Sequence, residues 1–308
     1  MEELSGPFRG ILLTDKSVVT VGKFDALHVG HMRLIDATVA LARETGASPV
    51  LLTFGGMAGD RQSRLLTRGE TAERIEAAGV GIYIIMDFDN ELREMAAERF
   101  VEDILLERLN CISVVAGEGF RFGHDRLGDV ALLEKMGAEH GFAARAVPDV
   151  AGPDGARISS ARIRELVFSC DFGAAAELLG YNYYISGEVG HGKKLGRKLG
   201  FPTINVVPAP EKLLPPDGVY ATKTVISGDE SVYPGVTNVG VNPTVWGGPA
   251  AGRRVESYLF GFEGDAYGRG IKTEFIGRIR GEVKFGSVGE LREQIARDVE
   301  SAKKYFYE

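Results

Sequence analysis

Cysteine is scarce in this sequence, which has only Cys111 and Cys170 among its 308 residues. The two cysteines are far apart along the chain and do not form a CxxC pair. A disulfide framework needs several cysteines, and a cysteine-based metal site needs close spacing. We therefore interpret both residues as reduced and structural, as is usual for intracellular proteins.

An excess of positive charge is also missing, because 36 basic residues face 43 acidic ones and the net charge is −7. Surfaces that bind nucleic acid are usually basic, so no nucleic-acid partner is expected. No apolar run reaches the roughly 18 residues of a membrane-spanning helix, so no membrane association is expected. Residues 1–6 carry neither a basic n-region nor an apolar stretch, and we expect a cytoplasmic location.

Two patterns of secondary structure are present, and the length predicts about two domains of roughly 100–200 residues. In the first part of the chain, strand-like and helix-like segments alternate. Repeated βα units predict a parallel sheet with right-handed crossovers. The expected strands are 17–22, 49–54, 82–86, 112–116 and 142–147, and the expected helices are 29–45, 71–78, 91–109, 130–140 and 160–168.

From Tyr183 onward, short β-rich runs are separated by glycine and proline, which predicts an antiparallel barrel or sandwich. The chain ends in a predicted helix over 288–305, for which Ser287 and Glu290 form a capping box. We predict domains at 1–181 and 182–308. The expected strands of the second domain are 183–189, 203–207, 219–226, 233–241, 255–260 and 271–279.

The first motif, VGKFDALHVGH at residues 21–31, follows the first predicted strand and opens the first predicted helix. A helix N-terminus binds phosphate through its unpaired N–H groups and the positive end of its dipole. His28 and His31 are three residues apart, so both can face a phosphate whose charge grows in the transition state. Such a pair can also cap the helix or bind a metal, although no further Cys/His cluster for structural zinc is evident.

This stretch resembles the His-x-Gly-His signature of the nucleotidyltransferase superfamily. In its longer form it resembles the adenylyltransferase module of bacterial bifunctional riboflavin kinase/FAD synthetases, and residues 158–164, ISSARIR, resemble the second signature of the superfamily. The resemblance implies an α/β nucleotidyltransferase-like, Rossmann-like first domain in which His28 and His31 act in adenylyl transfer. The ATP- and phosphate-binding residues that it implies are Gly22, Phe24, Asp25, Gly30, Ser159, Ser160 and Arg164.

Several positions depart from the family pattern. Lys23 and Ala26 stand where Asn and Gly are usual, and Ala161 stands where threonine is common. Gly119 replaces a polar residue, and Gly-Gly-Met-Ala follows Phe54 in place of Glu-Pro-His-Pro. We therefore keep a monofunctional riboflavin kinase, with a weakened or vestigial adenylyltransferase domain, as the alternative.

The second motif covers residues 187–205. Its first part, GEVGHGKK at 187–194, nearly matches a Walker A loop, but Lys194 replaces the Ser or Thr that would meet Mg²⁺. Gly200 and Pro202 also argue against the helix that a P-loop requires. The sequence therefore does not favour a P-loop at this position.

The longer stretch closely resembles the riboflavin kinase signature, with its core GRKLGFPTIN at 196–205. Thr203 and Asn205 are two residues apart on a predicted strand, so their side chains share one face. Both offer hard oxygen ligands, which suit Mg²⁺ bound alongside ATP phosphates. The ATP-binding residues implied for this half are Gly192, Lys193 and Asn242.

Phosphorylation of riboflavin requires a base that removes the proton of a neutral ribityl hydroxyl. The family pattern places this base in residues 255–260, which makes Glu256 the candidate, although a glutamate on a strand usually faces solvent. The segment 279–285 resembles the flavin side of the site, and the resemblance implies Arg280 and Phe285 as flavin-binding residues.

The resemblance runs from about Val19 to Lys303, in the domain order of the bifunctional family. It implies that an all-β six-stranded riboflavin kinase barrel with a C-terminal helix follows the α/β domain. The expected partners are ATP, riboflavin and FMN, with Mg²⁺ as cofactor and the flavin as substrate and product; a homo-oligomer stays open. Two other hypotheses are a flavin- or nucleotide-binding regulatory module without turnover and a nucleotidyltransferase for another phosphate ester.

Overall fold

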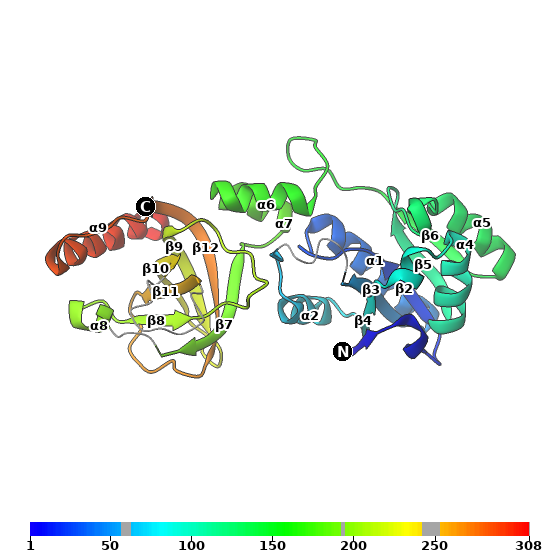
Figure 1. Cartoon of the computed structure of the whole chain (residues 1–308), viewed down its shortest axis with the longest axis horizontal. Helices are drawn as coiled ribbons and strands as arrows, with labels where there is room; N and C mark the ends of the chain where they lie inside the picture. The colour runs from blue at the N-terminus through cyan, green and yellow to red at the C-terminus, as the bar shows by residue number, and fades with distance from the viewer. Residues whose placement is uncertain (57–62, 192–194, 242–252, 308) are drawn as a thin grey trace. The chain divides into compact units, whose positions relative to one another are not determined.

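The computed structural model describes residues 1–56, 63–191, 195–241 and 253–307 (Figure 1). The chain divides into two compact units, Met1–Ser159 and Ser160–Glu308. Within the described residues, no helix is long and apolar enough to cross a membrane. The domain limits of 1–181 and 182–308 stay a prediction.

The first unit is built on a six-stranded sheet with the order β1-β4-β3-β2-β5-β6, in which every neighbouring pair is parallel. The alternating pattern predicted five of these strands, β2 to β6, and the prediction is confirmed. The strands are β1 (Glu2–Gly6), β2 (Ser17–Val21), β3 (Ser48–Gly55), β4 (Ile82–Asp87), β5 (Cys111–Gly117) and β6 (Ala143–Val147).

Strand β1 was not expected from its sequence, EELSG, because it contains no β-branched or aromatic residue. It forms at the edge of the sheet through backbone pairing with β4, from Glu2 opposite Ile82 to Gly6 opposite Met86. The strand therefore depends on its partner and not on its own propensity.

Helices form in this unit where the periodicity predicted them, with one exception, and the predicted helix over 160–168 forms as α6 of the second unit. The predicted helix over 91–109 is broken, because Ala96 adopts an extended backbone with ψ of 151° and the last segment has π-helical bonding. The helical segments of this unit are η1 (Phe8–Gly10), α1 (Val29–Thr45), α2 (Arg68–Ala77), α3 (Asn90–Arg93), α4 (Ala97–Arg99), η2 (Phe100–Arg108), η3 (His124–Arg126) and α5 (Val130–His140).

The second unit is a closed barrel with the strand order β10-β11-β8-β7-β12-β9, whose neighbours are antiparallel. This confirms the predicted six-stranded barrel and its C-terminal helix. The elements are α6 (Ser160–Ser169), α7 (Phe172–Leu179), β7 (Tyr184–Gly190), α8 (Leu195–Leu199), β8 (Thr203–Val206), β9 (Gly218–Ile226), β10 (Val232–Val241), β11 (Arg253–Leu259), β12 (Gly270–Gly281) and α9 (Val288–Tyr307).

The interior of the barrel is filled by side chains, several of them hydroxyls. Thr237 hydrogen-bonds Thr222 at 2.7 Å and Ser257 at 2.8 Å, and all three residues are buried. Alternation along each strand then places the next residues on the outer face. On β11, Glu256 and Tyr258 therefore face outward, which brings the predicted base to the outside of the barrel.

Helix α9 packs on this outer face. Val299 and Ala302 of the helix form an apolar cluster with Val219, Ala221 and Val236 of the barrel. A Cβ at Gly277 on β12 would overlap the ring of Tyr305, so the glycine lets the end of α9 lie directly on the strand. The terminal helix is thus an integral wall of the second unit.

Candidate functional sites

The two histidines of the first motif meet at the N-terminus of α1. His28 caps the helix, and its Nδ1 accepts a hydrogen bond of 3.2 Å from the backbone N–H of His31. A Cβ at Gly30 would lie only 3.3 Å from Cε1 and Nδ1 of His28, so this glycine lets the imidazole fold over the first turn. The His28 and His31 rings stack with centroids 3.7 Å apart and an interplanar angle of 15°.

Burial makes both imidazoles neutral. The pKa of His28 is lowered to about 4, mainly by burial and to a smaller extent by the positive charge of Arg157, against the opposing effect of a backbone hydrogen bond. Burial likewise lowers the pKa of His31 to about 3, with a smaller contribution from His28. Because Nδ1 of His28 is an acceptor, its proton lies on Nε2, so the ring can donate one hydrogen bond outward.

One ring nitrogen of His31, Nδ1, is buried and has no hydrogen-bond partner in the described part of the chain. A buried polar atom without a partner costs about 1–3 kcal/mol. A ligand with a suitable polar group would remove that cost. The orphan atom therefore marks the helix start as a place where a bound group is expected.

The neighbouring motif residues shape the loop. Phe24 is buried and contacts the His31 ring edge-to-face at 5.1 Å, and a Cβ at Gly22 would lie 3.3 Å from the Phe24 ring. The Asp25 carboxylate accepts the N–H of Leu65 at 3.2 Å. Phe24 thus supports the histidine pair, and Asp25 holds the segment before α2. Direct phosphate contact by these residues stays a prediction.

Sequence reasoning missed Arg157. A Cβ at Gly119 would lie 3.4 Å from Nη2 of Arg157, so the guanidinium lies beside the position where the family has a polar side chain. Arg157 also forms an ion pair of 3.4 Å with Asp149, and its charge acts on His28. An isolated arginine far along the chain from both Gly119 and His28 has no sequence pattern that could have revealed this contact.

The second signature is divided between the two units. Ser159 ends the first unit, whereas Ser160 and Arg164 lie on α6 in the second. Their grouping with the histidine pair in one phosphate site stays a prediction.

Two of the residues predicted for the kinase site, Glu256 and Asn205, lie side by side on the outer face of the barrel. Glu256 on β11 pairs with Asn205 on β8 and, on its other side, with Asn238 on β10. Side chains directly opposite on neighbouring antiparallel strands have Cβ atoms about 4.5–5.5 Å apart. The predicted base and the predicted metal ligand are therefore neighbours, and Asn238 is a further polar neighbour to which the motifs assigned no role.

Asn205 has a buried side-chain oxygen that is available to bind a ligand. It is 8% exposed, and its Oδ1 is buried without a hydrogen-bond partner among the described residues. Thr203 lies two residues before it on the same strand. No group of three or more His, Cys, Asp or Glu residues in the described ranges is placed to hold a metal. These oxygen donors fit Mg²⁺ if ATP phosphates and water complete its coordination.

The turn before β8 is tightly packed. A Cβ at Gly196 would overlap the carbonyl oxygen of Phe201 and lie 3.3 Å from Oγ1 of Thr203. A short helix, α8, does form over Leu195–Leu199, although we argued against a P-loop helix here; it ends before Gly200, whose φ is +89°. Gly192, Lys193 and Asn242, the other predicted ATP-binding residues, lie outside the described residues.

On the predicted flavin side, Arg280 is tied to α9. Its guanidinium donates three hydrogen bonds of 2.7–3.1 Å to the carboxylate of Asp298, which is 3% exposed. Gln294 donates a further bond of 2.8 Å to the same carboxylate. The Arg280 guanidinium also lies 5.8 Å from the ring centroid of Phe285. Arg280 and Phe285 are thus close together, and flavin contact by them stays a prediction.

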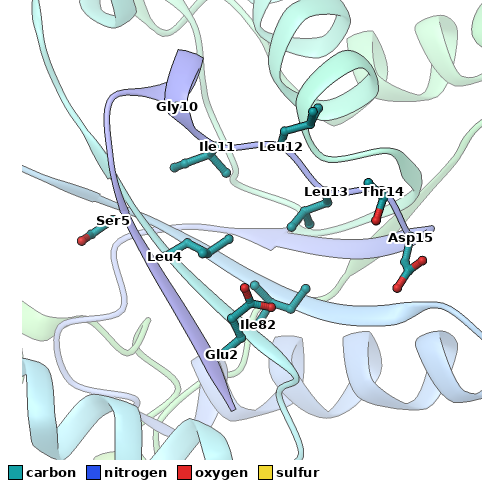
Figure 2. A pocket seen from close by; sticks show the side chains of 10 residues that line it. All are labelled: Glu2, Leu4, Ser5, Gly10, Ile11, Leu12, Leu13, Thr14, Asp15 and Ile82. Carbon is teal, nitrogen blue, oxygen red and sulfur yellow. The ribbon is translucent and has the colours of Figure 1, made fainter.

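A pocket also lies at the β1 edge of the first unit, and none of the predicted site residues lines it (Figure 2). Its wall is formed by β1, the start of β4 and the segment leading into β2. The lining residues are Glu2, Leu4, Ser5, Gly10, Ile11, Leu12, Leu13, Thr14, Asp15 and Ile82.

Comparison with known proteins agrees with the two-unit architecture. Residues 12–162 match the FAD synthetase family, and residues 179–306 match the riboflavin kinase family. The bifunctional riboflavin kinase/FMN adenylyltransferase of Escherichia coli K12 is 35% identical over 295 residues, covering 94% of this chain and 92% of its own. The protein of the same name from Bacillus subtilis is 32% identical and covers 94% and 93%.

A crystal structure has the same fold over nearly the whole chain. It is that of a protein named as a macrolide-efflux protein from Streptococcus pneumoniae, which is 28% identical. The match covers 98% of this chain and 99% of the other, with a TM-score of 0.82.

Proposed function

This chain belongs to the family of bifunctional riboflavin kinase/FMN adenylyltransferases, and from that membership we propose that it phosphorylates riboflavin to FMN and adenylylates FMN to FAD. The observation that carries the kinase half is the pairing of Glu256 with Asn205, whose Oδ1 is buried and orphaned among the described residues. ATP serves both reactions, and a cytoplasmic location belongs to the proposal because ATP is available there.

In the kinase reaction, Glu256 accepts the proton of the terminal ribityl hydroxyl. The oxygen of that hydroxyl bonds to the γ-phosphorus of ATP as the bond to the β,γ-bridging oxygen breaks, giving FMN and ADP. Thr203 and Asn205 would hold Mg²⁺, which would offset the negative charge of the phosphates when bound. The outer face of β8 and β11 therefore supplies the base and the metal ligands side by side.

In the adenylyltransferase reaction, the phosphate of FMN attacks the α-phosphorus of ATP, and pyrophosphate leaves. The attacking phosphate is already ionised, so no general base is needed. Neutral His28 and His31 support the transition state by donating N–H bonds to oxygens on which charge accumulates. Their position at the start of α1 adds the unpaired N–H groups of the helix.

The alternative of a kinase with a vestigial first domain rested on the departures at Gly119 and after Phe54. The likeness to bifunctional relatives over 94% of the chain supports both activities instead. Arg157 supports this further, because it lies beside Gly119 and adds a positive charge near His28.

The test is to incubate the purified chain with riboflavin and MgATP and to separate the flavins by chromatography over time. FMN followed by FAD is the expected result. FMN alone at long times would contradict the adenylyltransferase half, and riboflavin alone would contradict the kinase half. Glu256→Gln should abolish FMN formation while FMN supplied in the medium is still converted to FAD.

A further inference from the structure

The proposed kinase site contains a second carboxylate to which no role has been assigned. Glu282 directly follows β12, two residues after Arg280 and three before Phe285. Its Oε1 lies so close to Gly240 that it would overlap a Cβ if that residue were alanine. Glu282 is exposed, so its position on the barrel does not result from burial in an apolar core.

Register on β10 connects Glu282 to the base. Gly240 and Asn238 are two residues apart and share the outer face of the strand. The amide nitrogen of Asn238 would lie 3.5 Å from a Cβ at position 240, the same Cβ that Oε1 of Glu282 would overlap, and Asn238 pairs with Glu256. The Glu282 carboxylate therefore lies over Gly240 of β10, two residues along that strand from Asn238, which pairs with the proposed base Glu256 on β11.

The side on which Glu282 lies indicates which substrate it meets. In the strand order, β10 and β8 lie on opposite sides of β11, so Asn205 and Glu282 are on opposite sides of Glu256. A carboxylate beside the triphosphate would repel it. Glu282 thus belongs to the side of the phosphoryl acceptor.

On that side, the proposed flavin ring lies at Arg280 and Phe285, and the terminal ribityl hydroxyl lies at Glu256. The internal ribityl hydroxyls then lie between these two places. A carboxylate only accepts hydrogen bonds, and those it accepts from hydroxyls are strong. We propose that Glu282 accepts hydrogen bonds from the internal hydroxyls of the ribityl chain and selects a polyhydroxylated acceptor. Gly240 is required because any side chain there displaces this carboxylate. The inference rests on the proposed kinase function.

The test compares riboflavin with a flavin that carries a 5-hydroxypentyl chain, which keeps the terminal hydroxyl and lacks the internal ones. In the wild type, kcat/KM should favour riboflavin. In Glu282→Ala the ratio of the two kcat/KM values should fall by about tenfold, the loss expected for a charge-assisted hydrogen bond. KM for ATP should stay unchanged.

Gly240→Ala provides the second variant. Its new Cβ meets the end of a flexible side chain, so the barrel should fold and only the carboxylate should move. The riboflavin preference should fall as in Glu282→Ala, and the double variant should lose no more than either single one. Matched controls are Glu230→Ala, an exposed glutamate between β9 and β10, and Gly69→Ala, where a Cβ meets nothing within 4 Å.

An unchanged preference ratio in both Glu282→Ala and Gly240→Ala would overturn the inference while leaving the kinase proposal intact. A wild type that forms no FMN from riboflavin would overturn the proposed function and this inference with it. A fall in the ratio in the two control variants would show that the effect is not specific to Glu282 and would also overturn it.

Discussion

The imidazole of His31 lies on that of His28 with the ring centroids 3.7 Å apart, at the first turn of a helix. Two imidazolium ions would repel each other at this separation, and burial keeps both rings neutral. In the proposed adenylyl transfer, the pair would therefore act on a phosphate as neutral hydrogen-bond donors in a fixed geometry. Its contribution depends on position more than on charge.

Loss of the pair should affect one reaction only. In His28→Ala/His31→Ala, conversion of FMN to FAD should slow by at least about a hundredfold, as when transition-state donors are removed from other enzymes. Formation of FMN from riboflavin should stay within about twofold of the wild type, because the barrel is a separate unit. Each reaction is measured with its own flavin substrate. A parallel loss of both activities would contradict the assignment.

The histidines should also make the first unit sensitive to acid. Their folded-state pKa values of about 4 and 3 lie below the ordinary 6.5, so between these limits the unfolded chain binds more protons. Stability is therefore complete above about pH 6.5 and falls as the pH drops toward 4, by at most about 1.4 kcal/mol per pH unit for each histidine.

Calorimetric unfolding at a series of pH values checks this expectation. His28→Gln/His31→Gln should show a shallower fall of the melting temperature between pH 6.5 and 4. Arg157→Gln serves as a second probe, because removal of its charge should raise the pKa of His28 and reduce the acid sensitivity. An identical pH profile for wild type and the double variant would show that the histidines do not titrate as stated.

Asn205 should be required for activity and not for stability. Its buried Oδ1 lacks a partner among the described residues, so Asn205→Ala removes an unmet polar group and should leave the melting temperature within about 2 °C. Riboflavin phosphorylation should fall by at least about a hundredfold. Asn205→Asp, which keeps an oxygen ligand, should retain more activity at high Mg²⁺ than Asn205→Ala. Equal activity of the two variants at every Mg²⁺ concentration would argue against a metal role.

The ion pair of Arg280 and Asp298 should hold α9 on the barrel. Asp298→Ala leaves a partly buried guanidinium without its carboxylate, which should cost about 3–5 kcal/mol. Arg280→Met/Asp298→Leu should recover much of that stability, since an apolar pair replaces the ion pair. If flavin binding needs the Arg280 guanidinium, the double variant should be stable and still bind riboflavin weakly. Fluorescence titration of riboflavin, alongside urea unfolding, separates the two effects.

Gly196 should be intolerant of any side chain. In Gly196→Ala, the new Cβ overlaps the carbonyl oxygen of Phe201, which is backbone and cannot rotate away. The turn that leads into Thr203 at the start of β8 should shift, and the apparent affinity for MgATP should fall by about tenfold or more. Gly190→Ala, in the same unit with open space around its Cβ, is the matched control. Wild-type KM for ATP in Gly196→Ala would show that this packing is not needed.

The elements that carry a clear periodicity could be predicted from the sequence. Alternating βα segments predicted β2 to β6, and short apolar runs between glycines predicted the barrel. The motifs also predicted that Glu256 and Asn205 share one site, although the register that pairs them appears only in the structure. Strand β1 and the break at Ala96 could not be predicted, because both depend on tertiary contacts and not on local propensity.

Contacts between side chains distant in sequence were equally hidden. Arg157 beside Gly119, and Glu282 over Gly240, each join residues from segments that carry no shared pattern. In both pairs a glycine leaves the room that a distant charged side chain uses. The sequence shows Gly119 only as a missing polar side chain, whereas the fold shows Arg157 beside that position.

The hydroxyl chain of Thr222, Thr237 and Ser257 fills the middle of the barrel. With that interior packed, the proposed kinase residues Glu256 and Asn205 lie on the convex outer wall of the barrel, and a convex wall cannot by itself keep water from a bound γ-phosphate. Discrimination between riboflavin and water must then come from the elements that pack on this outer wall. Among the described residues, helix α9 is one such element. The rate of futile ATP hydrolysis without riboflavin thus measures how well that cover fits, independently of how well the base works.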